Sequence, residues 1–173
     1  MAPQTQTDLP PIAGYHPTTL IDWPGRLAAI VFLPGCNFRC PFCHAGPLLG
    51  DPAEVVPLEG CRRFREAGLG VKLDTNGTRP EMVERLLADG LVDAVAMDVK
   101  APLDHRYGEA CGTAEVDLDA VRRSLAFLMK SRVEVTFRTT VVPTLHGEDE
   151  IRAMGASIAG ADTWTLQSFE PEG

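Results

Sequence analysis

The sequence contains no long hydrophobic run, and none of its apolar stretches approaches the roughly 18 residues that a membrane-spanning helix needs. The segment from Met1 to Leu20 has neither a basic leader nor the apolar core of a signal peptide. We therefore expect a cytoplasmic protein without a membrane partner. Because 45% of the 173 residues are hydrophobic, the chain can still bury a sizeable core.

Positive charge is also scarce, with 16 Lys and Arg residues against 24 Asp and Glu residues and a formal net charge of -8. A nucleic-acid-binding surface needs an excess of Lys and Arg, because it must neutralise phosphates. We therefore expect no nucleic-acid partner. The local group of Arg62, Arg63 and Arg65 is expected to form the solvated face of a helix.

Cysteines are few and odd in number, which argues against a disulfide framework. Three of the five, Cys36, Cys40 and Cys43, have C-x3-C-x2-C spacing directly after the apolar run Leu27–Leu33. Iron-sulfur clusters are held by cysteine thiolates, and a cluster of four irons normally takes four of them. Three close ligands would leave one iron open, which is typical of a metal site that acts on a small molecule. We predict that these cysteines hold a [4Fe-4S] cluster.

Two other interpretations of the cysteines stay open at this point. Zinc takes four ligands and His44 is available, but its position next to Cys43 makes simultaneous tetrahedral ligation awkward. Cys40 and Cys43 also match a redox C-x-x-C pattern, which leaves Cys36 unexplained. We expect no role in the cluster for Cys61, on a predicted helix, or for Cys111, in a predicted loop.

Strand-like and helix-like segments alternate along the chain, which predicts an α/β domain with a parallel sheet. A flexible tail, residues 1–13, is expected to precede this single domain, residues 14–173. Ligands bind beyond the carboxyl ends of parallel strands, and Cys36, Asp74, Asp98 and Lys100 lie at or just past such ends. The strand-like runs are Leu27–Leu33, Val71–Asp74, Val92–Val99, Val133–Val142 and Thr163–Phe169. Helices are expected at Cys61–Ala67, from Pro80 to Gly90, behind the cap Asp117, and around Ile151, Met154 and Ile158.

Several motifs give the chain a specific resemblance. The cysteine loop with Phe42 and His44 resembles the cluster loop of the radical S-adenosylmethionine enzymes. The flanking segments occur in the order found in glycyl-radical activating enzymes, and especially in the activating proteins of anaerobic ribonucleoside-triphosphate reductases. These segments are Thr18–Arg26, Lys72–Gly77, Ala96–Ala101, Arg138–Pro143 and Leu166–Phe169.

This resemblance implies a partial parallel (β/α) barrel and an anaerobic oxidoreductase. The cluster on Cys36, Cys40 and Cys43 would cleave S-adenosylmethionine reductively to a 5'-deoxyadenosyl radical, which installs a glycyl radical on a partner enzyme. The expected partner is anaerobic ribonucleotide reductase, with flavodoxin or ferredoxin as electron donor. The cofactor-binding residues would be Phe42 near the adenine, Asp74 and Asp98 at the methionine end, and Lys100 opposite the cofactor carboxylate.

One strand-helix unit of the family is missing. Relatives place a strand ending in Gly-Gly-Glu-Pro between the cluster loop and the Asp-Thr-Asn-Gly strand, whereas here only residues 44–70 intervene. Either the unit is deleted, or the printed chain skips residues near 57–62. We favour the second explanation, which predicts a break in the backbone between Pro57 and Arg62.

Two alternatives to a glycyl-radical activating enzyme also remain. One is a radical S-adenosylmethionine enzyme that acts on a small molecule. The other is a catalytically inactive iron-sulfur or zinc-binding fragment, which the missing strand would favour.

Overall fold

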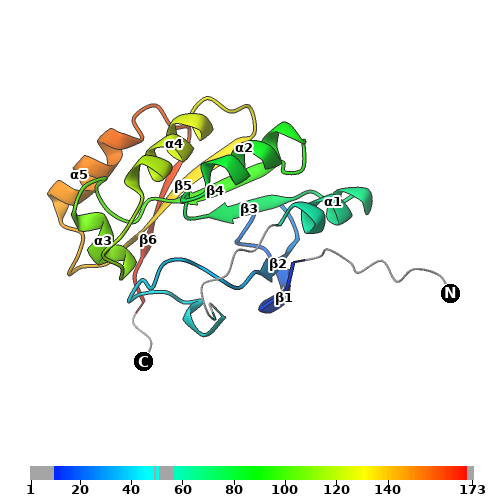
Figure 1. Ribbon diagram of the computed structural model, residues 1–173, viewed down its shortest axis with the longest axis horizontal. Helices are drawn as coiled ribbons and strands as arrows, with labels where there is room; N and C mark the ends of the chain where they lie inside the picture. The colour runs from blue at the N-terminus through cyan, green and yellow to red at the C-terminus, as the bar shows by residue number, and fades with distance from the viewer. Residues whose placement is uncertain (1–9, 49, 51–56, 171–173) are drawn as a thin grey trace. The chain divides into compact units, whose positions relative to one another are not determined.

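The computed structural model describes residues 10–48, 50 and 57–170, which form two compact units (Figure 1). The first unit contains the chain up to Asn37 and from Ala45 to Gly70, and the second contains Phe38–His44 and the chain from Val71 onward. The chain therefore changes units twice in this region, after Asn37 and after His44. Cys36 belongs to the first unit, and Cys40 and Cys43 belong to the second.

The second unit is built on a four-stranded parallel sheet. Its strands are β3 (Lys72–Thr75), β4 (Ala94–Asp98), β5 (Glu134–Val141) and β6 (Trp164–Ser168), in the spatial order β3-β4-β5-β6. Each strand thus pairs with the next one along the chain, as in a section of a barrel, whereas a doubly wound sheet reverses its order. The predicted α/β class with a parallel sheet is confirmed.

Helices connect these strands. They are α2 (Pro80–Ala88), α3 (Arg106–Cys111), α4 (Leu118–Leu128) and α5 (Glu148–Ser157), and α2 packs beside α4 on one face of the sheet (Figure 1). The predicted helix starts are confirmed: Pro80 is the first residue of α2, and the Asp117 side chain accepts a hydrogen bond from Ala120 N-H at 2.9 Å. No helix among the described residues is long and apolar enough to cross a membrane.

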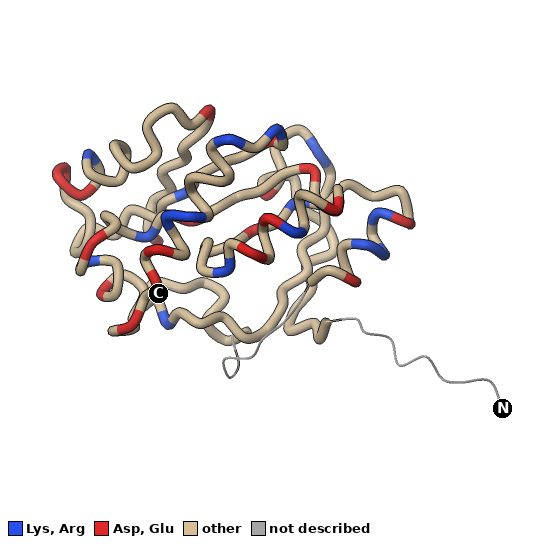
Figure 2. Tube along the Cα trace, turned by 45° about the horizontal axis from the view of Figure 1, so that its top comes forward, with Lys and Arg blue, Asp and Glu red and all other residues tan. Residues whose placement is uncertain are grey.

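The core of this unit centres on β4. Its residues from Ala94 to Met97 are at most 1% exposed, because neighbouring strands pair on both edges and side chains cover both faces. Apolar residues of α2, α4 and α5 complete the core, including Val83, Leu86, Val121 and Met154. Figure 2 shows acidic and basic residues interspersed over the helices of this unit.

The first unit contains a two-stranded antiparallel sheet, β1 (Gly14–Thr19) with β2 (Ala28–Phe32). We had expected the Leu27–Leu33 run to join the parallel sheet, and this was wrong, since β2 pairs with β1. The sequence analysis missed β1, whose Pro17 has no N-H and lies where the register shifts between His16 and Thr19. Ala13 N-H also donates to the Phe32 carbonyl oxygen at 2.8 Å. Residues 1–9 of the predicted tail lie outside the described residues.

The predicted break or deletion between Pro57 and Arg62 concerns the full-length sequence and stays a prediction. Helix α1 spans Leu58–Glu66, and Cys61 N-H donates to the Pro57 carbonyl oxygen at 2.9 Å. The segment before it includes a short 3-10 helix, η1 (Gly46–Leu48), while residues 49 and 51–56 lie outside the described residues. No strand occurs between β2 and β3 in the described part of the chain.

Candidate active site

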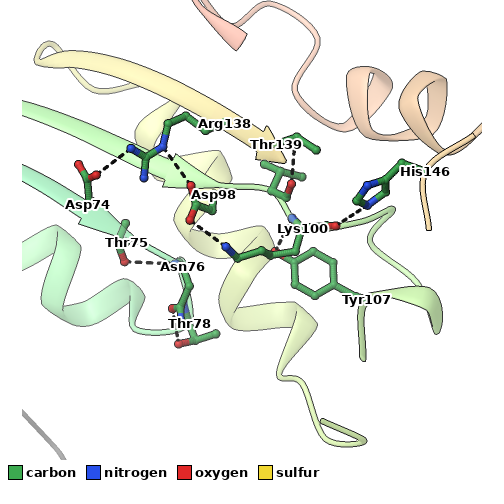
Figure 3. Close-up of polar contacts among 12 residues, drawn as sticks. Asp74, Thr75, Asn76, Thr78, Asp98, Lys100, Tyr107, Arg138, Thr139 and His146 are labelled. Atoms are coloured by element: carbon green, nitrogen blue, oxygen red, sulfur yellow. Dashed lines mark hydrogen bonds and ion pairs between the residues drawn. The ribbon is translucent and has the colours of Figure 1, made fainter. Parts of the chain in front are cut away.

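The carboxyl edge of the parallel sheet carries a row of charged side chains from three strands (Figure 3). Arg138 of β5 donates from Nη1 to Asp74 Oδ2 at 2.7 Å and from Nε to Asp98 Oδ1 at 3.0 Å. Asp98 and Arg138 occupy paired register positions of β4 and β5, so their side chains lie on the same face of the sheet. Arg138 thus links two residues that the sequence analysis assigned to cofactor binding.

Lys100 completes this row. Its Nζ donates to Asp98 Oδ2 at 2.9 Å, so both oxygens of Asp98 accept hydrogen bonds from cations. Burial raises the pKa of Asp98, but Lys100 and Arg138 outweigh burial and bring that pKa below its ordinary value. Burial lowers the pKa of Lys100, and Asp98 more than offsets it, so that pKa is raised. Both groups are therefore charged at neutral pH.

Asp74 is more accessible than Asp98, with a side chain that is 48% exposed. One of its oxygens is bonded to Arg138, and the other lies 3.5 Å from Lys72 Nζ. Asp98 holds two cations in place, whereas Asp74 can take a further donor from solvent or from a ligand. Of the two carboxylates predicted to contact the cofactor, Asp74 is thus the more accessible to a ligand.

The backbone of Lys100 is held on both sides by buried groups that the sequence analysis left without a role. Tyr107 Oη accepts from Lys100 N-H at 3.3 Å, and His146 Nε2 lies 2.8 Å from the Lys100 carbonyl oxygen. Val142 N-H donates to His146 Nδ1 at 2.9 Å, so the ring hydrogen must be on Nε2, where it donates to Lys100. Tyr107 of α3 and His146, in the loop before α5, therefore fix the backbone of Lys100 and with it the origin of the Lys100 side chain.

The Asp-Thr-Asn-Gly segment turns sharply after β3. Gly77 has φ +76°, and a Cβ atom there would lie 2.0 Å from Met97 Cε. Its N-H donates to Thr75 Oγ1 at 3.1 Å, and its carbonyl oxygen accepts from Ser124 Oγ at 2.7 Å. The positive φ favours glycine here, and an added Cβ atom would also require the end of the Met97 side chain to move. The turn places Asn76 beside the charged row in Figure 3.

Part of the cysteine loop packs within the second unit. Phe38 is buried and lies edge-on to Tyr107, with ring centroids 6.4 Å apart. Cys43 N-H donates to the Cys40 carbonyl oxygen at 3.1 Å, which closes a turn. Lys100 Nζ lies 6.0 Å from the ring centroid of the buried Phe42, at the limit for a cation-π contact. The structure therefore brings Cys40, Phe42 and Lys100 to the same edge of the sheet.

Cys40 has a perturbed environment. A hydrogen bond from the Cys111 side chain lowers the pKa of Cys40 to about 7, burial opposes this shift, and the nearby Lys100 charge adds to it. A thiolate is the form that binds metals. Cys111 was expected in a loop, but it is the last residue of α3 and fully buried. Its contact with Cys40 could not be inferred from their separation in the sequence.

The loop offers three thiols, which are the donor type of iron-sulfur clusters. None of the five cysteines is in a disulfide, and Cys36, Cys40 and Cys43 are all half-buried. Within the described residues, no three His, Cys, Asp or Glu side chains are gathered closely enough to hold a metal ion. The assignment of a cluster to Cys36, Cys40 and Cys43 therefore stays a prediction from the residue types of the loop.

The second unit is thus a parallel α/β sheet with charged groups at its carboxyl edge, the edge at which ligands bind in such sheets. No family model matches the chain. A curated relative from Methanocaldococcus jannaschii, named "Putative glycyl-radical enzyme activating enzyme MJ1227", is 30% identical over 195 residues, which cover 93% of this chain and 80% of the relative. The chain therefore belongs to the glycyl-radical activating enzymes of the radical S-adenosylmethionine superfamily.

The alignment also bears on the missing strand-helix unit. It runs over 195 residues, more than the 173 of this chain, so the relative contains residues without a counterpart here.

Proposed function

We propose that this protein is an iron-sulfur enzyme that uses S-adenosylmethionine to install a glycyl radical on anaerobic ribonucleotide reductase. Membership of the activating-enzyme family supports the general activity. The resemblance of the flanking motifs to activating proteins of anaerobic ribonucleotide reductases supports this partner. The observation that carries the proposal is the packing of Cys40 and Phe42 beside Lys100 at the carboxyl edge of the sheet.

Cys36, Cys40 and Cys43 would hold a [4Fe-4S] cluster and leave one iron for the cofactor. When bound, the cluster supplies the electron, received from flavodoxin or ferredoxin, that cleaves S-adenosylmethionine to methionine and a 5'-deoxyadenosyl radical. The hydrogen atom removed in the proposed reaction would come from a glycine of the partner. The remaining chemistry is binding and orientation, which the residues of this chain provide.

Lys100 would bind the carboxylate of the cofactor. Its ammonium has three donors, one of which is committed to Asp98, and the side chain is 19% exposed. Asp74, with its more exposed carboxylate, would accept from the cofactor amine, while Asp98 orients Lys100 and Arg138. Charge-assisted hydrogen bonds contribute roughly 1.5 to 3 kcal/mol each. Phe42 would cover the adenine edge.

A second candidate is an iron-sulfur or zinc-binding protein without catalysis. It is favoured by the absence of a strand between β2 and β3 in the described chain, since that strand carries the Gly-Gly-Glu segment of relatives. Loss of two charge-assisted contacts would weaken cofactor binding by about 3 to 6 kcal/mol, or roughly two to four decades in affinity.

One experiment separates the two candidates. The purified protein is reconstituted anaerobically with iron and sulfide, reduced with dithionite and incubated with S-adenosylmethionine. The proposal predicts 5'-deoxyadenosine by chromatography, and none from Cys36→Ala, Cys40→Ala or Cys43→Ala. A filled cluster without any cofactor cleavage would favour the second candidate, and stoichiometric zinc without iron uptake would exclude the cluster.

A further inference from the structure

Side chains from three other elements bind the backbone just beyond the end of β4 (Figure 3). The Val99 carbonyl oxygen accepts from Thr139 Oγ1 at 2.8 Å, and Lys100 N-H donates to Tyr107 Oη at 3.3 Å. The Lys100 carbonyl oxygen lies 2.8 Å from His146 Nε2, which is the shorter of the two contacts to the Lys100 backbone. His146 is therefore a principal support of the residue that carries the proposed cofactor-binding ammonium.

The His146 ring is itself fixed by the turn that follows β5. Val142 N-H donates to His146 Nδ1 at 2.9 Å, and the Val142 carbonyl oxygen accepts from the His146 N-H at 2.9 Å. One residue thus binds both backbone polar groups of Val142, and His146 is only 6% exposed. Because Nδ1 is an acceptor, the ring hydrogen is on Nε2 and is directed at the Lys100 carbonyl oxygen. The ring therefore ties the end of β5 to the chain after β4.

The position of the Lys100 ammonium depends on this backbone contact. The side chain is a flexible four-carbon stem, and its end is bonded to Asp98 Oδ2 at 2.9 Å. A rotation of the peptide group between Lys100 and Ala101 would turn the start of the stem, so the ammonium could stay on Asp98 only in another rotamer. The ammonium is therefore held at one end by Asp98 and at the other by the bonds to the Lys100 backbone.

We propose that His146 is a positioning residue for Lys100: its Nε2-H holds the Lys100 backbone so that the ammonium stays on Asp98, ready for an anionic ligand. The inference rests on the proposed function, in which that ligand is the carboxylate of S-adenosylmethionine. The simpler role for His146 is to satisfy two buried backbone groups, for which both ring nitrogens matter equally. Positioning of Lys100 depends on Nε2.

Two substitutions separate the ring nitrogens. In His146→Asn, the amide oxygen takes the place of Nδ1 and can still accept from Val142, but no donor reaches Lys100. In His146→Gln, the amide nitrogen takes the place of Nε2 and can still donate to Lys100, while Val142 N-H loses its acceptor. Since each variant keeps one of two buried hydrogen bonds, urea unfolding should show similar losses of stability.

The first readout is nuclear magnetic resonance of the lysine ammonium groups, which needs no cofactor. The sequence contains three lysines, Lys72, Lys100 and Lys130, so the signals are few, and Lys100→Met assigns the one from Lys100. A hydrogen-bonded ammonium exchanges its protons slowly with water and is observed, whereas a freed one is not. We expect the Lys100 signal in the unaltered protein and in His146→Gln, and its loss in His146→Asn. The same signal in both variants, or none in the unaltered protein, would overturn the inference.

The ring hydrogen is checked in the unaltered protein, where no folding defect of a variant can intervene. In mildly alkaline buffer, the nitrogen chemical shifts of His146 should show the hydrogen on Nε2 and none on Nδ1. A hydrogen on Nδ1 would remove the donor to Lys100 and with it the proposed role.

The second readout is the affinity for S-adenosylmethionine, measured by equilibrium dialysis with the reconstituted protein. His146→Asn should bind about tenfold more weakly, and His146→Gln should stay within about threefold of the unaltered protein. Equal losses in the two variants would leave only the structural role. If the unaltered protein binds no S-adenosylmethionine, the proposed function fails, while the ammonium signals and the ring hydrogen still decide whether His146 positions Lys100.

Discussion

Asp98 and Arg138 are paired directly across neighbouring strands, with Arg138 Nε 3.0 Å from Asp98 Oδ1 and the two residues at matched register positions of β4 and β5. Since Arg138 also bonds Asp74 of β3, a single guanidinium joins three strands at the edge where the cofactor is proposed to bind.

Replacing Arg138 by Met should destabilise the protein. The change leaves Asp98 with Lys100 alone and Asp74 with Lys72 alone. Breaking a fully buried pair costs roughly 3 to 5 kcal/mol, so a loss of about 2 kcal/mol is expected for this partly screened one. Urea unfolding followed by circular dichroism measures it. Arg152→Met is the matched control, because its pair with Glu148 is exposed and should contribute under about 1 kcal/mol. Equal effects of the two changes would contradict a special role for Arg138.

Acid should weaken the fold through Asp98. Its folded pKa is lower than the ordinary 3.8, so its ionisation contributes stability that is present above that value and lost as the pH falls through the folded pKa. We expect the free energy of unfolding to fall more steeply below about pH 4 in the unaltered protein than in Asp98→Asn. The same acid slope in both proteins would show that Asp98 is not preferentially ionised in the folded state.

Gly77→Ala should cost more stability than Gly90→Ala. Both glycines have positive φ, and the left-handed conformation alone costs an alanine roughly 1 to 2 kcal/mol. Only at Gly77 would the added Cβ also displace Met97, whereas at Gly90 it meets nothing within 4 Å. Overpacking of this kind typically adds about 1 to 3 kcal/mol. Thermal unfolding of the two variants measures the difference, and equal losses would mean that the Gly77 turn is not packed on β4.

Lys100→Met should weaken S-adenosylmethionine binding by roughly one to two decades, because it removes one charge-assisted hydrogen bond. Equilibrium dialysis with the reconstituted protein measures this affinity. Asp98→Ala should produce a similar loss, since Asp98 orients the Lys100 ammonium. Lys130→Met, an exposed lysine beyond the end of α4, is the control and should bind normally. Unchanged affinity in Lys100→Met would remove that residue from the site.

Local patterns were sufficient to predict the strands of the parallel sheet and the start of α2 and α4. Val, Ile and Leu runs and the residues Pro80 and Asp117 act within a few positions of the chain. The β1 strand was missed because Gly14 and Pro17 interrupt its pattern. The six-residue α3 was missed because it is short and contains Gly108.

The candidate site was predictable only in part. Asp74, Asp98 and Lys100 were found because they follow strand-like runs. Arg138 lies inside its strand, and its pairing with two carboxylates depends on strand order and register, which hydrophobic periodicity does not determine. The contact between Cys40 and Cys111 depends on the docking of α3, for which no local signal exists.

The most direct test of the central claim is electron paramagnetic resonance of the partner enzyme. Anaerobic ribonucleotide reductase from the same genome is incubated with the reconstituted protein, S-adenosylmethionine and dithionite, and in parallel with the Cys40→Ala variant. The proposed function predicts a glycine-centred radical signal on the reductase that appears with 5'-deoxyadenosine and is absent with Cys40→Ala. Formation of 5'-deoxyadenosine without a radical on the reductase would contradict the proposed partner, and the absence of both products would contradict the activity itself.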